Sequence, residues 1–117
     1  MILLDTSAVV EWLNGTKAGK KVEKICAEHN VRISAITLNE ALIIDGRENA
    51  LGLFRVVDFD AKTAHYSAEL ERVLKKKGKP LSKLDTLIAG TAMTYNVTLL
   101  TLDNDFKHVP GLDVVMV

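Results

Sequence analysis

Short apolar runs alternate with amphipathic segments along this chain, a pattern typical of strands that alternate with helices. Five runs rich in Val, Ile and Leu predict buried strands, at residues 2–4, 31–34, 55–58, 97–101 and 112–116. Strands connected through helices form a parallel sheet covered on both faces. We therefore predict an α/β fold, a three-layer α/β/α sandwich with a central parallel sheet of about five strands.

The segments between these runs have helical periodicity and end at helix-stopping residues. We predict helices over residues 6–13, 17–28, 37–44, 61–77 and 84–95, with one or two further turns within 48–54. Asn14-Gly15, Asp45-Gly46 and Gly78 end three of them. The apolar spacing of the longest helix predicts a buried stripe of Tyr66, Leu70, Val73 and Leu74. The same spacing in the second helix predicts a buried face of Val22, Ile25, Cys26 and His29.

Four acidic residues lie where predicted strands end or predicted helices begin. Asp5 and Asp103 follow strands, Glu40 is in the first turn of a helix, and Asp85 opens the helix before the fourth strand. Right-handed crossovers place the carboxyl ends of parallel strands at one edge of the sheet, where ligands bind. The four carboxylates should converge there. Converging carboxylates without basic partners repel one another, and a hard divalent cation relieves that repulsion.

Each acid also has a structural explanation. Thr37–Glu40 and Ser82–Asp85 fit the capping-box spacing. Asp5 could cap the following helix, and Asp103-Asn104-Asp105 fits a turn. Any single acid is explained by its local role, whereas four on one edge favour a metal-dependent hydrolase.

Composition limits the class of protein. The 117 residues, 48% apolar and 26% charged, suit a single domain spanning 1–117. No apolar run approaches the roughly 20 residues of a membrane span, and the single Cys26 allows no internal disulfide. We expect a cytoplasmic protein without a membrane partner.

Charge is balanced overall but uneven along the chain. Fifteen basic and fifteen acidic residues give a net charge of +0. Five lysines fall directly before Asp85: Lys75, Lys76, Lys77, Lys79 and Lys83. They are either a solvated helix end or a basic rim that binds a polyanion such as RNA.

Other chemistries have little support in the sequence. The three histidines lack zinc-ligand spacing, and neither a nucleophile elbow nor a phosphate-binding glycine loop occurs. A phosphatase of the haloacid dehalogenase type would need a second Asp two residues after Asp5, where Ser7 stands.

The segments around the acids resemble those of the PIN-domain ribonuclease family, and within it the VapC-type toxins of toxin–antitoxin pairs. The matching motifs are LDTSA at residues 4–8, SAITLNE at 34–40, LDTLIA at 84–89 and LTLDNDF at 100–106, followed by VPGL at 109–112. This resemblance spans nearly the whole chain. It implies a PIN-like fold and an endoribonuclease that uses Mg²⁺ or Mn²⁺ to cleave RNA.

The resemblance assigns roles to particular residues. Asp5, Glu40, Asp85 and Asp103 would be catalytic and hold the metal. The supporting residues would be Thr6, Ser7, Thr101 and Asp105. A small antitoxin protein and a homodimer are the implied protein partners. The family uses the region equivalent to residues 41–54 for both contacts, and that region is short here. An RNA-processing nuclease and a non-catalytic PIN-fold module that binds RNA or protein remain alternatives.

Overall fold

A computed structural model describes residues 1–45 and 48–117 of the chain. Its strands are β1 (Ile2–Leu4), β2 (Val31–Ser34), β3 (Arg55–Val57), β4 (Thr98–Thr101) and β5 (Val114–Met116). They form one sheet in the order β3-β2-β1-β4-β5, and every neighbouring pair is parallel. The predicted parallel sheet of about five strands is confirmed. The strand order reverses between β1 and β4, because the chain adds β2 and β3 on one side before crossing to the other.

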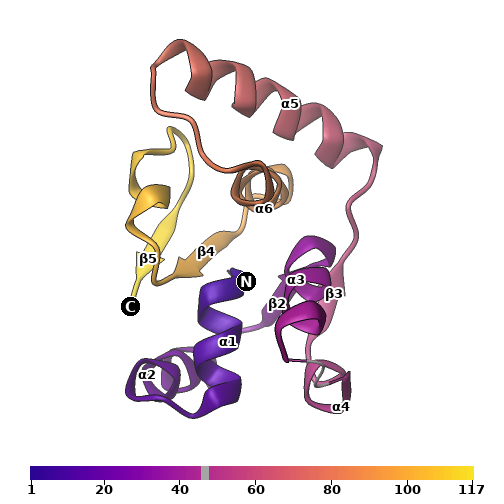
Figure 1. The fold of residues 1–117 in the computed structure, drawn as a ribbon, viewed down its shortest axis with the longest axis vertical. Coiled ribbons are helices and arrows are strands. Elements are labelled where there is room, and N and C mark those ends of the chain that lie inside the picture. The colour runs from indigo at the N-terminus through magenta and orange to yellow at the C-terminus, as the bar shows by residue number, and fades with distance from the viewer. Residues whose placement is uncertain (46–47) are drawn as a thin grey trace.

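Helices cover both faces of this sheet (Figure 1). They are α1 (Thr6–Asn14), α2 (Lys17–Cys26), α3 (Ala35–Asp45), α4 (Glu48–Leu51), α5 (Ala61–Lys76) and α6 (Lys83–Thr94), with a 3-10 turn η1 (Asn104–His108) before β5. Helices α1 to α4 pack on one face and α5, α6 and η1 on the other. The α/β/α sandwich is therefore confirmed.

Alternating side chains of the central strands supply the two cores. Leu3 and Leu99 are paired neighbours that contribute to the core under α5 and α6. Leu4 and Leu100, also paired, contribute to the core under α1 and α2. All four are fully buried. The central strands therefore carry apolar residues at every position, because both of their faces are covered.

The third helix begins two residues earlier than its sequence pattern predicts. The hydroxyl of Ser34 accepts the N–H of Thr37 at 2.9 Å, so α3 already starts at Ala35. Thr37 therefore lies inside the helix, and Glu40 is in its second turn rather than its first. The capping box predicted for Thr37 and Glu40 is wrong, since the amide that it required is capped by Ser34.

The buried face of α5 also differs from the prediction. Leu70 and Leu74 are buried as expected, but Tyr66 and Val73 are 47% and 36% exposed. Thr63 and Ser67 face the interior instead. The reason is close packing against α6, where a Cβ added to Gly90 would lie 2.0 Å from Ser67 Oγ.

Helix α2 ends at Cys26, so the prediction that His29 belongs to its buried face is wrong, and His29 is exposed. Cys26 is buried as predicted, and burial raises the pKa of its thiol to about 11.

The third strand stops at Val57 rather than at Asp58. Gly46, which the sequence predicts to end α3, lies outside the described residues. Within the described ranges, no helix combines the length and apolar character needed to cross a membrane.

Candidate active site

Asp5 is the most deeply buried of the four acids, with 3% exposure. It follows β1 and caps α1, since its Oδ1 accepts the Ala8 N–H at 3.0 Å. The Ser7 hydroxyl donates to the same oxygen at 2.7 Å, and the Thr101 hydroxyl donates to Oδ2 at 2.6 Å. Every oxygen of this carboxylate is therefore held, and the capping role predicted for Asp5 is confirmed.

Ser7 in the first turn of α1 and Thr101 at the end of β4 also join the C-terminal ends of β1 and β4. The Leu102 N–H donates to Ser7 Oγ at 3.2 Å, and the Asp103 N–H donates to Thr101 Oγ1 at 2.9 Å. Each hydroxyl accepts from a backbone amide and donates to Asp5. Two such links fix the Asp5 carboxylate at the point where the strand order reverses.

Glu40 reaches this edge from α3. The Thr6 hydroxyl at the start of α1 donates to Glu40 Oε1 at 2.6 Å. The hydroxyl of Thr37, which is fully buried, lies 3.4 Å from that of Thr6. Sequence analysis missed Thr37 as part of this cluster, because its spacing from Glu40 was assigned to a helix cap.

Asp85 and Asp103 complete the set from α6 and from the end of β4. Ser82 caps α6, with its Oγ accepting the Asp85 N–H at 3.2 Å, which confirms the Ser82 half of the capping box predicted there. Asp103 Oδ1 accepts the Asp105 N–H at 2.9 Å, the predicted turn. Asp105 thus contacts Asp103 through its backbone, and its own side chain is exposed.

The charges of the four acids influence one another. Burial raises the pKa of Asp85, and the negative charges of Asp103, Asp5 and Glu40 raise it further, against a hydrogen bond from Ser82 that lowers it. Burial also raises the pKa of Asp5, with Asp103 adding to the rise and hydrogen bonds from Thr101, Ala8 and Ser7 opposing it. Four carboxylates from four elements therefore share one electrostatic environment.

No cation compensates this charge within the described residues. The two ion pairs found there join Glu71 to Lys75 at 3.5 Å and to Lys83 at 3.1 Å, and neither includes one of the four acids. Hard carboxylate and hydroxyl oxygens with uncompensated charge fit Mg²⁺ or Mn²⁺ as a donor set. In residues 1–45 and 48–117, no three His, Cys, Asp or Glu side chains form a ready-made metal-binding group.

The five predicted RNA-contacting lysines lie at the end of α5 and the start of α6. All are exposed. Lys75 and Lys83 are engaged by Glu71, and their side chains remain 68% and 69% exposed. Lys83 is two residues before Asp85, so this cluster adjoins the acidic edge through α6.

Comparison with known proteins identifies the family. The PIN domain family matches residues 2–112. This chain belongs to the PIN domain family. Its relatives within the family include a Ribonuclease VapC of Rickettsia bellii, 32% identical over an alignment that covers 99% of this chain and 96% of the relative. Toxin FitB of Neisseria gonorrhoeae is 31% identical, with 88% of each protein covered.

Solved structures agree with this PIN domain fold. VapBC2 of Rickettsia felis, solved bound to a DNA fragment from its promoter, superposes with a TM-score of 0.84 and 27% identity. That match covers 100% of this chain and 99% of the other. The alignment to the Rickettsia bellii relative runs over 134 positions, more than the 117 residues here, so the relative has residues that this chain lacks.

Proposed function

We propose that this PIN domain is an endoribonuclease that depends on Mg²⁺ or Mn²⁺, and that it is the toxin of a VapBC-type toxin–antitoxin pair. The observation that carries the proposal is the convergence of Asp5, Glu40, Asp85 and Asp103 without a cationic partner among the described residues. The relatives named as VapC ribonucleases support the choice of RNA as substrate. An RNA substrate also fits a cytoplasmic location.

The residues divide into metal ligands and groups that hold those ligands. Asp5, Asp85 and Asp103 would hold the metal, and Glu40 would ligate it or position a water. When bound, the metal supplies Lewis-acid activation of water and neutralises charge at the scissile phosphate. Thr101 and Ser7 keep the Asp5 carboxylate oriented through hydrogen bonds of 2.6 and 2.7 Å. Thr6 orients Glu40 in the same way.

Substrate binding requires a basic surface next to this acidic edge. Lys76, Lys77 and Lys79 have no ion pair in the described part of the chain. They can therefore contact RNA phosphates without first leaving an acidic partner. Phosphate contacts of this kind weaken steeply as salt is added.

The test is cleavage of single-stranded RNA by purified protein, with Mg²⁺ or with a chelator. Wild-type protein should cleave only with metal. Asp85→Asn should lower the rate by about 100-fold or more, because a metal ligand contributes several kcal/mol to transition-state stabilisation. Asp113→Asn is the matched control, since Asp113 precedes β5 at the opposite edge of the sheet and accepts from Thr98 at 2.7 Å. Equal cleavage by both variants would make the site assignment wrong.

The antitoxin partner is supported by apolar side chains left in solvent. Ile43 and Ile44 near the end of α3 are 76% and 60% exposed, and Leu53 after α4 is 85% exposed. These exposed apolar side chains are candidate contacts for a protein partner. The solved structure of VapBC2 from Rickettsia felis contains a VapBC pair, the type of complex proposed for this chain. Co-purification with the product of a small neighbouring reading frame tests the partner.

A further inference from the structure

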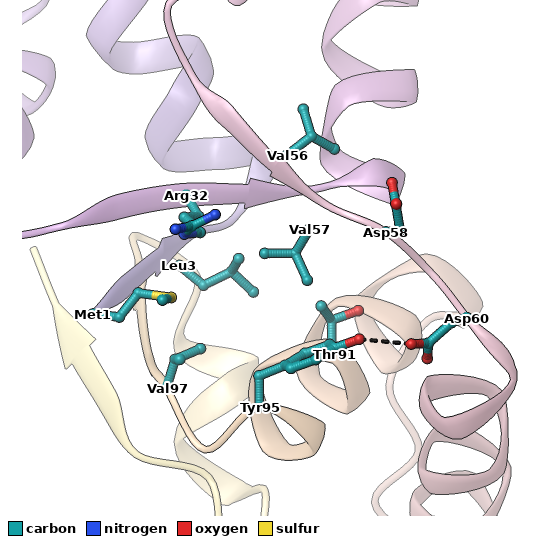
Figure 2. Close-up of a pocket in the computed structure, with 10 residues that line it drawn as sticks. All are labelled: Met1, Leu3, Arg32, Val56, Val57, Asp58, Asp60, Thr91, Tyr95 and Val97. Carbon is teal, nitrogen blue, oxygen red and sulfur yellow. Dashed lines mark hydrogen bonds between the residues drawn. The ribbon is translucent and has the colours of Figure 1, made fainter.

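A pocket separate from the acidic edge opens between the sheet and the C-terminal half of α6. Its volume is about 340 Å³. Figure 2 shows its lining, with Leu3 and Arg32 from the sheet, Val57 at the end of β3, Thr91 from α6 and Tyr95 just after that helix. Thr91 lies six residues after Asp85 on the same helix, or about 9 Å along its axis. None of the four acids lines this pocket.

The size and walls of this pocket suit a small organic molecule. Sites for such ligands have volumes of about 300–1,000 Å³ and mostly apolar walls with a few polar groups. Leu3, Val57 and Val97 supply apolar wall here, and the exposed ring of Tyr95 borders it.

Arg32 carries the buried hydrogen-bond donor of this lining that lacks a partner. It pairs in register with Leu3, so its side chain leaves the sheet on the same face, toward the pocket. Its Nε is buried and makes no hydrogen bond. Neither of the two ion pairs among the described residues involves Arg32. A buried donor without an acceptor is unfavourable by about 1–3 kcal/mol, and more when the group is charged. Arg32 is therefore poised to accept an anionic ligand.

Asp60, Tyr95 and Thr91 of the pocket already have partners, and Asp58 is exposed to solvent. Asp60 caps α5 by accepting from Thr63 and also accepts the Tyr95 hydroxyl at 2.8 Å. The Thr91 hydroxyl donates to the Leu87 carbonyl at 2.8 Å. Figure 2 places Asp58 and Asp60 at the end of the pocket away from Arg32. The buried donor without an acceptor is thus at the arginine end of the pocket, and an anion bound there would accept its hydrogen bond.

We propose that this pocket binds a small carboxylate with an apolar or aromatic body. The carboxylate lies on the Arg32 guanidinium, which presents donors in a planar fork that matches carboxylate oxygens. The body lies against Leu3 and Val57 and beside the Tyr95 ring. Asp58 and Asp60 at the other end exclude a second negative group.

The experiment uses 4-fluorophenylacetate as the probe, observed by fluorine NMR during titration with the full chain. Its neutral analogue 4-fluorophenylacetamide has the same body without the charge. We expect binding of the carboxylate, and binding at least about tenfold weaker for the amide and for Arg32→Leu, as the loss of a charge-assisted hydrogen bond implies. Arg72→Leu, which removes an exposed arginine from α5, should leave the affinity unchanged.

A second measurement needs no variant. Titration of wild-type protein with the carboxylate should shift the Arg32 Nε–H resonance in a proton–nitrogen correlation spectrum. Equal affinity for acid and amide, an unmoved Arg32 resonance, or equal displacement by inorganic phosphate would each overturn the proposal. Because binding is measured without RNA, the outcome does not depend on whether the protein cleaves RNA.

Discussion

At the scale of single residues, hydroxyl groups rather than cations hold the candidate catalytic carboxylates. Thr101 is fully buried, and its hydroxyl donates to Asp5 and accepts from the Asp103 amide. These hydrogen bonds favour the ionised form of Asp5 and oppose the effect of its burial. A carboxylate held by hydroxyl donors is oriented without being neutralised by a cation.

Thr101→Val keeps the shape of the side chain and removes its hydroxyl. It leaves an Asp5 oxygen and the Asp103 N–H without partners, so we expect the free energy of unfolding to fall by about 1–3 kcal/mol. Urea denaturation followed by circular dichroism measures the change. Thr94→Val is the control, because the Thr94 hydroxyl donates only to the Gly90 carbonyl within α6. If both variants lose the same stability, Thr101 has no special part in the acidic cluster.

At the scale of elements, small residues let helices approach closely enough to set the layers of the sandwich. Gly19 on α2 lies against the backbone of α1, where an added Cβ would be 1.9 Å from the Glu11 carbonyl oxygen. Gly90 on α6 lies equally close to Ser67 on α5. The second contact matters for the site, because α6 carries Asp85 at its start.

Gly90→Ala should force α5 and α6 apart. The new Cβ would meet Ser67 Oγ at 2.0 Å and Ser67 Cα at 3.0 Å, so we expect a loss of about 1–3 kcal/mol despite the better helix propensity of alanine. Adding Ser67→Gly removes the nearest obstructing atoms and should restore part of the loss. Urea denaturation of both single variants and the double variant gives the coupling energy. Purely additive losses would contradict the proposed contact.

At the scale of the whole molecule, the fold gathers negative charge from four separate elements. Asp5 follows β1, Glu40 is on α3, Asp85 is on α6 and Asp103 follows β4. The net charge of +0 does not reveal this concentration of negative charge. The folded state should therefore respond to a divalent cation more strongly than the unfolded chain, in which the acids are far apart.

Mg²⁺ should raise the Tm of the wild-type protein. A ligand at 100 times its dissociation constant stabilises the folded state by about 2.7 kcal/mol, which corresponds to roughly 10 °C for a chain of this length. Asp85→Asn should abolish most of this rise, and Asp113→Asn should keep it. Differential scanning fluorimetry with Mg²⁺ and with a chelator measures both. An unchanged wild-type Tm would contradict metal binding.

Without metal, Asp85→Asn should be at least as stable as the wild type at pH 7. The pKa of Asp85 is raised in the folded state, so the folded protein loses stability as the pH rises from about 4, the value for a free Asp, through the raised pKa. Asp85→Asn has no carboxyl group at this position, so its folded state does not lose stability in this way. The difference between the two proteins should shrink as the pH falls below about 4, where the carboxyl becomes neutral in both states.

Much of the fold could be predicted because the apolar runs are continuous. The predicted limits of β1 and β2 agree with the structure, since strands buried on both faces stand out from their polar flanks. The start of α3 could not be predicted in the same way. Ser34 both ends β2 and caps α3, and the pattern of apolar residues does not record which hydroxyl binds which amide.

The sequence alone determined the order of strands and helices, the four acids at their junctions, and the resemblance that names the PIN domain family. These features follow from local periodicity and motif spacing. Only the tertiary structure decided that hydroxyls of Thr6, Ser7 and Thr101 hold two of the acids, and that α5 turns Ser67 rather than Tyr66 inward. Only the tertiary structure placed Arg32 in the lining of a pocket and left its Nε without a hydrogen-bond partner. Such contacts join residues distant in the chain, and packing of the two layers of helices against the sheet sets them.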